Sequence, residues 1–371
     1  MRLLTIVLIL CGSALASEQP ANRTYPLWDG QESVADYAEH VNLPPAKTLD
    51  LGNNIKLELV LIPAGQFVMG TPEPKPIDED GFQKKIAFGQ ALLSASGVML
   101  LVMLVVVVIR AIRKRCRPQL SLRLLLLTTV AAGGCVLSGL HWQHSARRLE
   151  KAKADYEAAI WRFQSAYDDE KPAHSVTLKK PFYMGKYDVT QEQYQQTMGT
   201  NPSFFKGKDN PVERVSWNDA QAYCKKLSEQ TNETARLPSN AEWEFACRAG
   251  TTTAYYSGDG YTDLARVGWF DANSKNNPHP VGQKEPNAFG LYDMHGNVWQ
   301  LCEDWYGEDY YGKSGAENPQ GRPPQGVSHL MRGGSWEDNP TYSRSAFRMR
   351  QQKPNECDES EGFRVVVKAA R

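Results

Sequence analysis

Two glycine-containing segments near the C-terminus carry the residue types best suited to chemistry. In GLYDMHGNVWQLCEDWY, residues 290–306, Asp293 precedes Gly296 in a turn-rich stretch where a carboxylate and backbone carbonyls could converge. In MRGGSWEDNPTYSRSAFR, residues 331–348, the paired Gly333 and Gly334 allow close backbone approach or positive φ just before Trp336. Neither pattern is typical of a generic core, whereas the seven histidines are scattered and form no recognisable metal set.

The two segments resemble the formylglycine-generating enzymes, also called sulfatase-modifying factors. Further segments extend the resemblance in order over residues 55–75 and 172–367: LVLIPAGQFVMGT at 59–71, HSVTLKKPFYMGKYDVTQEQY at 174–194, NPVERVSWNDAQAYCKKL at 210–227, RLPSNAEWEFACRAG at 236–250 and EGFRVV at 361–366. The resemblance implies a loop-rich α+β domain with a C-type-lectin-like fold. It also implies oxidation of a sulfatase cysteine to formylglycine.

The family's oxidase chemistry implies a copper-binding cysteine pair soon after the glycine–glycine–serine–aromatic motif, because soft thiolates suit Cu(I). The matching positions here are Asp338 and Ser343, and neither side chain can replace a thiolate. The sequence therefore predicts a pseudoenzyme that does not use copper and binds a peptide or a protein partner. Two alternatives stay open: an enzyme of altered chemistry using Asp338, Tyr342 and Ser343, with formylglycine generation or another oxidation, and a lectin-like ligand-binding module.

Other site residues follow from the same resemblance. Trp299, Ser335 and Tyr342 correspond to positions around the family's substrate groove, although aromatic residues are equally common in a core. A structural calcium site corresponds to the side chains of Asp293 and Gln300 and the carbonyls of Gly296 and Val298. Gln300 replaces the usual glutamate, which removes one negative charge and weakens the predicted site; in the alternative, hydrogen bonds alone hold this turn.

The elements that must position these residues lie mainly in 172–371. Ser or Thr followed three residues later by an acidic or amide side chain predicts helices that begin at Thr190, Ser216 and Ser239. Residues 251–332 offer only short candidate strands. Cys224, Cys247, Cys302 and Cys357 allow three disulfide pairings, and the sequence assigns none of them.

The N-terminal half contains apolar segments that predict export and a membrane anchor. Residues 1–16 are typical of a signal peptide, 17–54 of a linker, and 55–75 of the first part of the family domain. Residues 86–109 and 124–140 are predicted to be transmembrane helices, with a pair of buried core helices as the alternative. Between them, residues 110–123 hold six basic residues and no acidic one, which places this loop in the cytoplasm.

The remaining features define the predicted topology. An apolar stripe over residues 145–167 predicts a helical stalk, which could pack on the segment before the first crossing or on a second copy in a homodimer. The family domain is then interrupted by a two-helix hairpin and lies outside the cytoplasmic membrane, in the periplasm or the extracellular space. An insertion of this kind requires its two ends to stay close. The 42 basic and 42 acidic residues give no net positive field, so nucleic acid is excluded as a partner.

Overall fold

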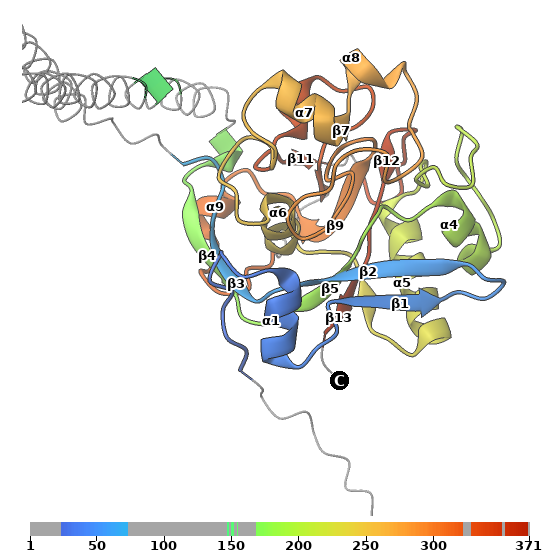
Figure 1. The fold of residues 1–371 in the computed structure, drawn as a ribbon. Helices are drawn as coiled ribbons and strands as arrows, with labels where there is room; N and C mark the ends of the chain where they lie inside the picture. The colour runs from blue at the N-terminus through green and yellow to red at the C-terminus, as the bar shows by residue number, and fades with distance from the viewer. Residues whose placement is uncertain are drawn as a thin grey trace, which may run out of the picture. The chain divides into compact units, whose positions relative to one another are not determined.

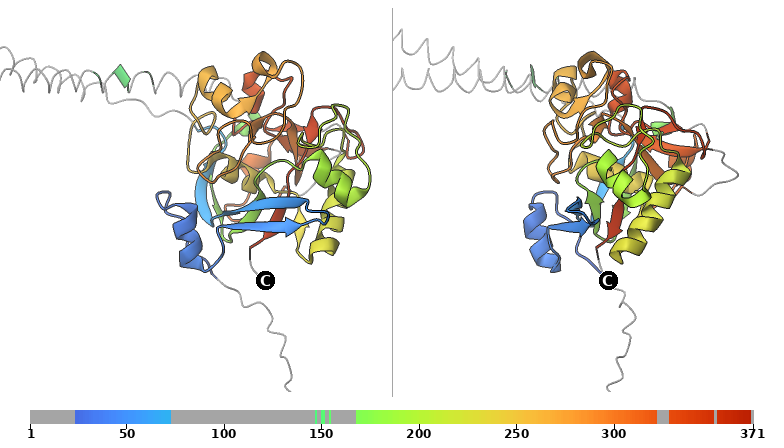
Figure 2. Two further views of the ribbon diagram at one scale, coloured as in Figure 1. Left: turned by 45° about the vertical axis from the view of Figure 1, so that its right-hand side comes forward. Right: turned by 90° about the vertical axis from the view of Figure 1, so that its right-hand side faces the viewer.

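Alternating apolar residues build the central sheet. In β2 (Lys56–Ile62), Leu57, Leu59 and Leu61 are buried while the intervening residues are more exposed. The other strands of this antiparallel sheet are β1 (Ala46–Asp50), β5 (Phe182–Gly185), β13 (Val366–Lys368) and β6 (Ala235–Arg236), in the order β1-β2-β5-β13-β6. Segments from both ends of the chain thus share one sheet in this computed structural model (Figures 1 and 2).

A second sheet carries the segments singled out in the sequence. Its order is β11 (Met349–Arg350), β10 (His329–Arg332), β9 (Trp299–Trp305) and β12 (Glu361–Gly362), with only the β9–β12 pair parallel. Two smaller sheets pair β3 (Gly65–Met69) with β4 (His174–Leu178), and β7 (Gly268–Trp269) with β8 (His295–Gly296). The predicted α+β, loop-rich fold class is therefore confirmed for the described residues.

Three helices begin where the sequence predicts. Thr190, Ser216 and Ser239 are the N-caps of α4 (Gln191–Met198), α5 (Trp217–Thr231) and α6 (Asn240–Arg248), and each closes a capping box. The remaining helices are α1 (Val34–Val41), α7 (Tyr261–Val267), α8 (Asp271–Ser274), α9 (Tyr310–Lys313) and the 3-10 helices η1 (Asp168–Glu170) and η2 (Pro340–Ser343).

The structure describes residues 24–72, 147, 150, 151, 154, 168–321, 328–350 and 353–369. The predicted signal peptide and both predicted transmembrane segments lie outside these ranges. Of the predicted stalk, the four described positions 147, 150, 151 and 154 are helical. Within the described ranges, no helix is both long enough and apolar enough to cross a bilayer. The chain divides into two compact units, one of residues 1–70 and 167–371 and one of residues 71–166.

The predicted linker at 17–54 is wrong for its described part. Helix α1 buries Tyr37, Ala38 and Val41 in the core, and the whole of β1 pairs with β2. The backbone N–H of Trp28 also donates to the carbonyl of Ala64 at 2.7 Å. The family domain therefore includes residues well before position 55. The sequence did not indicate them because α1 and β1 are too short to give a strong periodic signal.

The two ends of the predicted insertion lie in contact, as the sequence requires. Met69 pairs with His174, and a Cβ placed on Gly70 would lie 2.5 Å from the carbonyl oxygen of Glu170. In the acidic run 168–170, Asp169 and Glu170 are buried. Glu170 is fully buried and accepts two hydrogen bonds, of 2.7 and 2.8 Å, from the Arg344 guanidinium.

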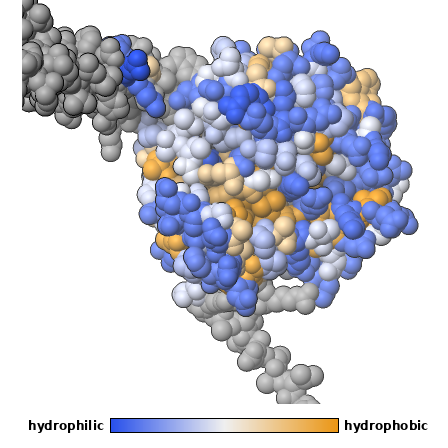
Figure 3. Space-filling model, in the orientation of Figure 1, coloured by the Kyte–Doolittle hydropathy of each residue, from blue (hydrophilic) through white to orange (hydrophobic). Residues whose placement is uncertain are grey.

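The surface shown in Figure 3 is hydrophilic over most of its area, with an apolar area near its centre. Large apolar side chains that are well exposed among the described residues come from different parts of the chain: Leu27, Val68, Phe204 and Tyr261.

Candidate functional site

The loop after β10 contains the two positions that would hold the family's cysteines. Gly333 and Gly334 have φ values of +97° and +74°, which confirms the predicted positive φ. A Cβ on Gly334 would lie 2.5 Å from the Ser343 hydroxyl oxygen. The loop therefore closes on itself at a contact that only glycine permits.

Asp338 is held inside this loop by its neighbours. The Ser335 hydroxyl donates to the Asp338 carboxylate, and the Asp338 N–H donates to the Ser335 carbonyl at 3.3 Å. Burial raises the pKa of Asp338, while hydrogen bonds from Ser335 and Trp299 lower it. Two of the three predicted groove residues, Ser335 and Trp299, thus surround this carboxyl group.

The third predicted groove residue lies in an aromatic contact. The Tyr342 ring is 5.0 Å from the ring of Phe347, and the Trp299 ring is 6.0 Å from the same ring. Trp299 is only 4% exposed and belongs to the core, whereas Tyr342 is half-buried. The alternative of core packing therefore describes Trp299 better than an open groove floor does.

Ser343 is fully buried, and its hydroxyl has no hydrogen-bond partner within the described residues. Its carbonyl accepts from the Nδ1–H of His295 at 2.7 Å, and His295 Nε2 accepts from the backbone N–H of Tyr256 at 3.0 Å. These bonds define the neutral tautomer of His295, and burial lowers its pKa to about 3. No periodicity or spacing in the sequence indicates this histidine, because it pairs with residues distant in the chain.

Cys247 lies beside His295, but this pair is not an activated thiol site. Cys247 Sγ is 3.7 Å from His295 Nε2 and 3.8 Å from the Ser345 hydroxyl. Both residues have no exposed surface, and burial raises the pKa of Cys247 to about 12. The thiol is therefore protonated and closed to solvent.

The residues at the two cysteine positions do not fit copper. They offer one carboxylate and one hydroxyl, which are hard donors. The four described cysteines of this unit, Cys224, Cys247, Cys302 and Cys357, are all free, and none stands at position 338 or 343. Burial raises the pKa of the three buried thiols above their ordinary value.

Among the predicted calcium ligands, the Gln300 side chain already has other partners. Gln300 Oε1 accepts from Trp243 Nε1 at 2.7 Å and from Arg364 Nε at 3.0 Å, so its oxygen is already used and a guanidinium lies beside it. Asp293 Oδ2 accepts from the Gly282 N–H at 2.7 Å, and Gln300 Nε2 donates to the Asp293 carbonyl at 2.8 Å. This matches the alternative in which hydrogen bonds hold the turn.

The other two predicted calcium ligands are buried in the same turn. Gly296 has φ of +77° and approaches the Trp269 carbonyl so closely that a Cβ would lie 2.0 Å from it, while Val298 is fully buried. Over the whole described part of the chain, no three His, Cys, Asp or Glu side chains are grouped to hold a metal ion.

Arg364 of the EGFRVV segment organises this turn, a role that the sequence did not reveal. Its guanidinium donates to the carbonyls of Gly185 at 2.6 Å and Tyr292 at 2.7 Å, and pairs with Asp188 at 3.3 Å. Burial raises the pKa of Asp188 to about 8 and that of Asp293 to about 6, and each carboxyl has one oxygen without a partner in the described region.

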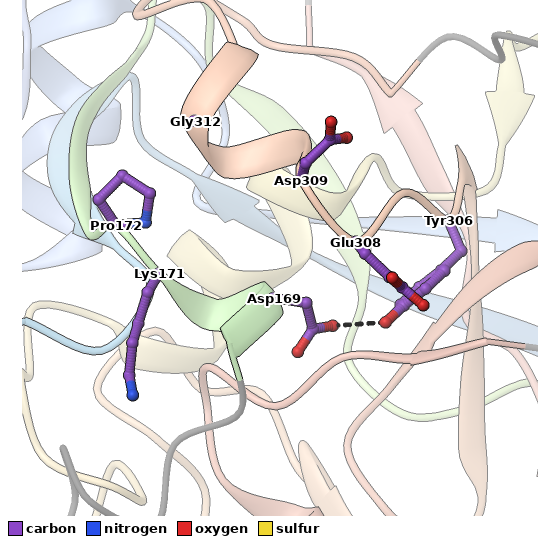
Figure 4. Close-up of a pocket in the computed structure, with 7 residues that line it drawn as sticks. All are labelled: Asp169, Lys171, Pro172, Tyr306, Glu308, Asp309 and Gly312. Carbon is purple, nitrogen blue, oxygen red and sulfur yellow. Dashed lines mark hydrogen bonds between the residues drawn. The ribbon is translucent and has the colours of Figure 1, made fainter.

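Two surface pockets lie away from Asp338 and Ser343. The first, of about 570 Å³, is lined by Asp169, Lys171, Pro172, Tyr306, Glu308, Asp309 and Gly312. Within it the Tyr306 hydroxyl donates to the Asp169 carboxylate at 2.8 Å (Figure 4). The second, of about 490 Å³, is lined by Trp217, Gln221, Glu303, Asp304, Trp305, Gln320 and Gly321.

Comparison with known proteins identifies relatives of this chain. Residues 143–369 match the model of the sulfatase-modifying factor enzyme 1-like domain. The chaperone protein LppX of Paenibacillus barcinonensis is 33% identical, over 47% of this chain and 74% of its own length. A formylglycine-generating enzyme of Streptomyces coelicolor is 36% identical, over 42% of this chain and 50% of its own length.

The solved structure of Treponema denticola variable protein 1 shares the fold. It has a TM-score of 0.58 and 22% sequence identity, over 88% of this chain and 99% of its own. An identity this low supports the fold alone.

Proposed function

The chain belongs to the sulfatase-modifying factor enzyme 1-like family, and from that premise we propose that it is a non-oxidising, partner-binding member of the family. In this proposal it is tethered to the cytoplasmic membrane by the segments 86–109 and 124–140, with its main domain outside the cytoplasm. The observation that carries the loss of oxidase activity is the donor set at the family's cysteine positions. A hydrogen-bonded carboxyl at Asp338 and a buried hydroxyl at Ser343 replace two thiolates.

A partner-binding role is supported by a row of three contacting aromatic rings next to the same loop, here called the aromatic ladder: Phe204, Phe205 and Trp336. Phe204 is 57% exposed and contacts Phe205 at 5.0 Å, and Phe205 contacts Trp336 at 5.3 Å. Exposed aromatic residues joined to a buried aromatic base are typical of binding hot spots. The LppX relative is named a chaperone protein, which also describes a binding role.

The oxidase half of the proposal is tested with the full-length protein, copper, oxygen and a Cys-x-Pro-x-Arg peptide. We expect no conversion of the peptide cysteine by mass spectrometry, because Cu(I) lacks its thiolates. The double variant Asp338→Cys with Ser343→Cys asks whether the loop can still present a copper pair. Conversion by the unmodified protein would overturn the proposal.

The binding half is tested on a peptide array. We expect Phe204→Ser to lose the peptides that the unmodified protein binds, because it removes the exposed end of the ladder. The matched control is Tyr261→Ser, since Tyr261 is 58% exposed and lies on α7. Equal losses in both variants, or binding of sugars in place of peptides, would contradict the assignment.

A further inference from the structure

The second pocket lies at the far end of β9 from the candidate site. Trp299, at the start of this strand, contacts Asp338, whereas Glu303, Asp304 and Trp305 at its end line the pocket. The pocket residues follow Trp299 by four to six positions along the strand, a distance of about 13 to 20 Å. The pocket is therefore a distinct feature that the family's oxidase chemistry does not use.

Two half-buried tryptophans form its aromatic wall, and a buried histidine holds them. The His329 ring stacks on Trp217 at 3.8 Å, with 7° between the planes, and lies 4.0 Å from the Trp305 ring with a tilt of 34°. Burial lowers the pKa of His329 to about 4, so the imidazole is neutral at pH 7. The Trp217 indole N–H is already donated to the Cys302 carbonyl at 3.0 Å, which orients that ring.

The polar lining of the pocket is acidic. Its described lining residues include Glu303, Asp304 and two glutamines, and no Lys or Arg. Asp304 accepts backbone N–H bonds from Asn240 at 2.8 Å and from Gly321, so it shapes the pocket. Glu303 differs, because its Oε2 is buried and has no hydrogen-bond partner in the described part of the chain.

The Arg236 guanidinium pairs with Glu303 but is shared with Glu242. Arg236 Nη1 is 3.8 Å from Glu303 Oε2, but the same guanidinium makes two hydrogen bonds, of 2.6 and 2.7 Å, to Glu242. Burial, together with the charges of Glu242 and Glu303, raises the pKa of Asp304 to about 6. A ligand with positive charge would relieve this repulsion, and an anion would increase it.

Indole faces and a carboxylate together select one ligand chemistry. Aromatic rings attract ammonium and guanidinium groups through their negative faces, and desolvation strengthens that attraction. A metal ion is disfavoured because the described residues nowhere group three metal-binding side chains. We propose that this pocket binds an organic cation, an alkylammonium or guanidinium group, against Trp217 and Trp305 and beside the Glu303 carboxylate.

The full-length protein, in a non-ionic detergent without ammonium groups, is titrated with candidate ligands, and binding is measured by calorimetry. Choline is compared with its neutral isostere 3,3-dimethylbutan-1-ol, and N-acetylarginine methylamide with the citrulline analogue. These arms separate a free small molecule from a peptide side chain as the source of the cation. We expect the cation of at least one pair to bind about tenfold more tightly than its isostere.

Variants show whether the effect arises in this pocket. Glu303→Gln should weaken cation binding about tenfold and leave isostere binding unchanged, and Glu308→Gln in the other pocket should change neither. Trp305→Leu should remove binding, and Trp305→Phe, which keeps a smaller ring, should retain part of it; thermal unfolding confirms that each variant is folded. Equal affinity for cation and isostere, tighter binding of glucose, or no binding by folded protein would overturn the proposal.

Discussion

At the scale of single residues, Asp338 and Ser343 show how the family's frame can persist while its donors change. Backbone features that close the loop, the positive φ of Gly333 and Gly334, are retained. The side chains that would bind copper are replaced by a carboxyl bonded to Ser335 and by a buried hydroxyl. The frame depends on glycine conformation, whereas the reaction depends on sulfur, so one can be lost without the other.

Asp293 leads to a prediction about pH at this scale. Burial raises its pKa from 3.8 to about 6, so the folded protein holds this proton more tightly than the unfolded chain. The contribution of Asp293 to stability is therefore greatest below pH 4 and is lost as the pH rises through 6, by up to about 3 kcal/mol for a shift of about two pKa units. Asp293→Asn should remove most of this loss, because asparagine keeps an oxygen for the Gly282 N–H and tolerates the φ of +54°.

The measurement is urea unfolding at pH 4.5 and pH 7.5. The variant should lose less stability than the unmodified protein over this range, and the exposed control Asp209→Asn should not change the difference. An unchanged pH dependence in Asp293→Asn would show that this carboxyl does not ionise in the folded domain.

At the scale of elements, the short helix η1 holds the C-terminal end of the insertion against the domain. Glu170 pairs with Arg344, and Asp169 lies 3.6 Å from Arg348, so both acids bind the segment that follows Ser343. On the other side of the junction, the Gly70 N–H donates to Glu244 at 2.9 Å, and Glu244 pairs with Arg248 and Arg332. Buried ion pairs thus connect the insertion's ends to the loop of the candidate site.

Breaking one of these pairs should be costly. We expect Glu170→Gln to lower the free energy of unfolding by about 3 kcal/mol, because it leaves the Arg344 guanidinium buried without its charge partner. Glu308→Gln, at an exposed position of the first pocket, should change it by less than about 0.5 kcal/mol. Thermal and urea unfolding measure both, and similar stabilities would mean that the ion pair contributes little.

At the scale of the whole molecule, the proposed hairpin leaves and re-enters the domain at one place. Gly70 contacts Glu170, so the two ends of the insertion lie together in the fold. The entropic cost of closing a loop grows only slowly with its length, so a long insertion at this place costs little. This explains how a family domain could carry two membrane crossings between β3 and β4.

Cysteine labelling tests this topology. In intact cells a membrane-impermeant maleimide should label Cys357, which is exposed in the main domain, and not Cys116, which belongs to the basic loop 110–123. Lysed cells should show labelling of both, which controls for reactivity. Labelling of Cys116 without lysis, or protection of Cys357, would reverse or remove the proposed membrane orientation.

The sequence by itself determined the family, the class of fold and the starts of α4, α5 and α6, because capping boxes and ordered motifs are local patterns. It also identified the replacement of the cysteine pair, since residue identity alone decides which soft ligands exist. Only the tertiary structure decided that Gln300 binds Trp243 and Arg364, that α1 and β1 belong to the domain, and that Trp217 and Trp305 both contact the His329 ring. These contacts join residues far apart in the chain, and their formation depends on packing and burial, which no local pattern encodes.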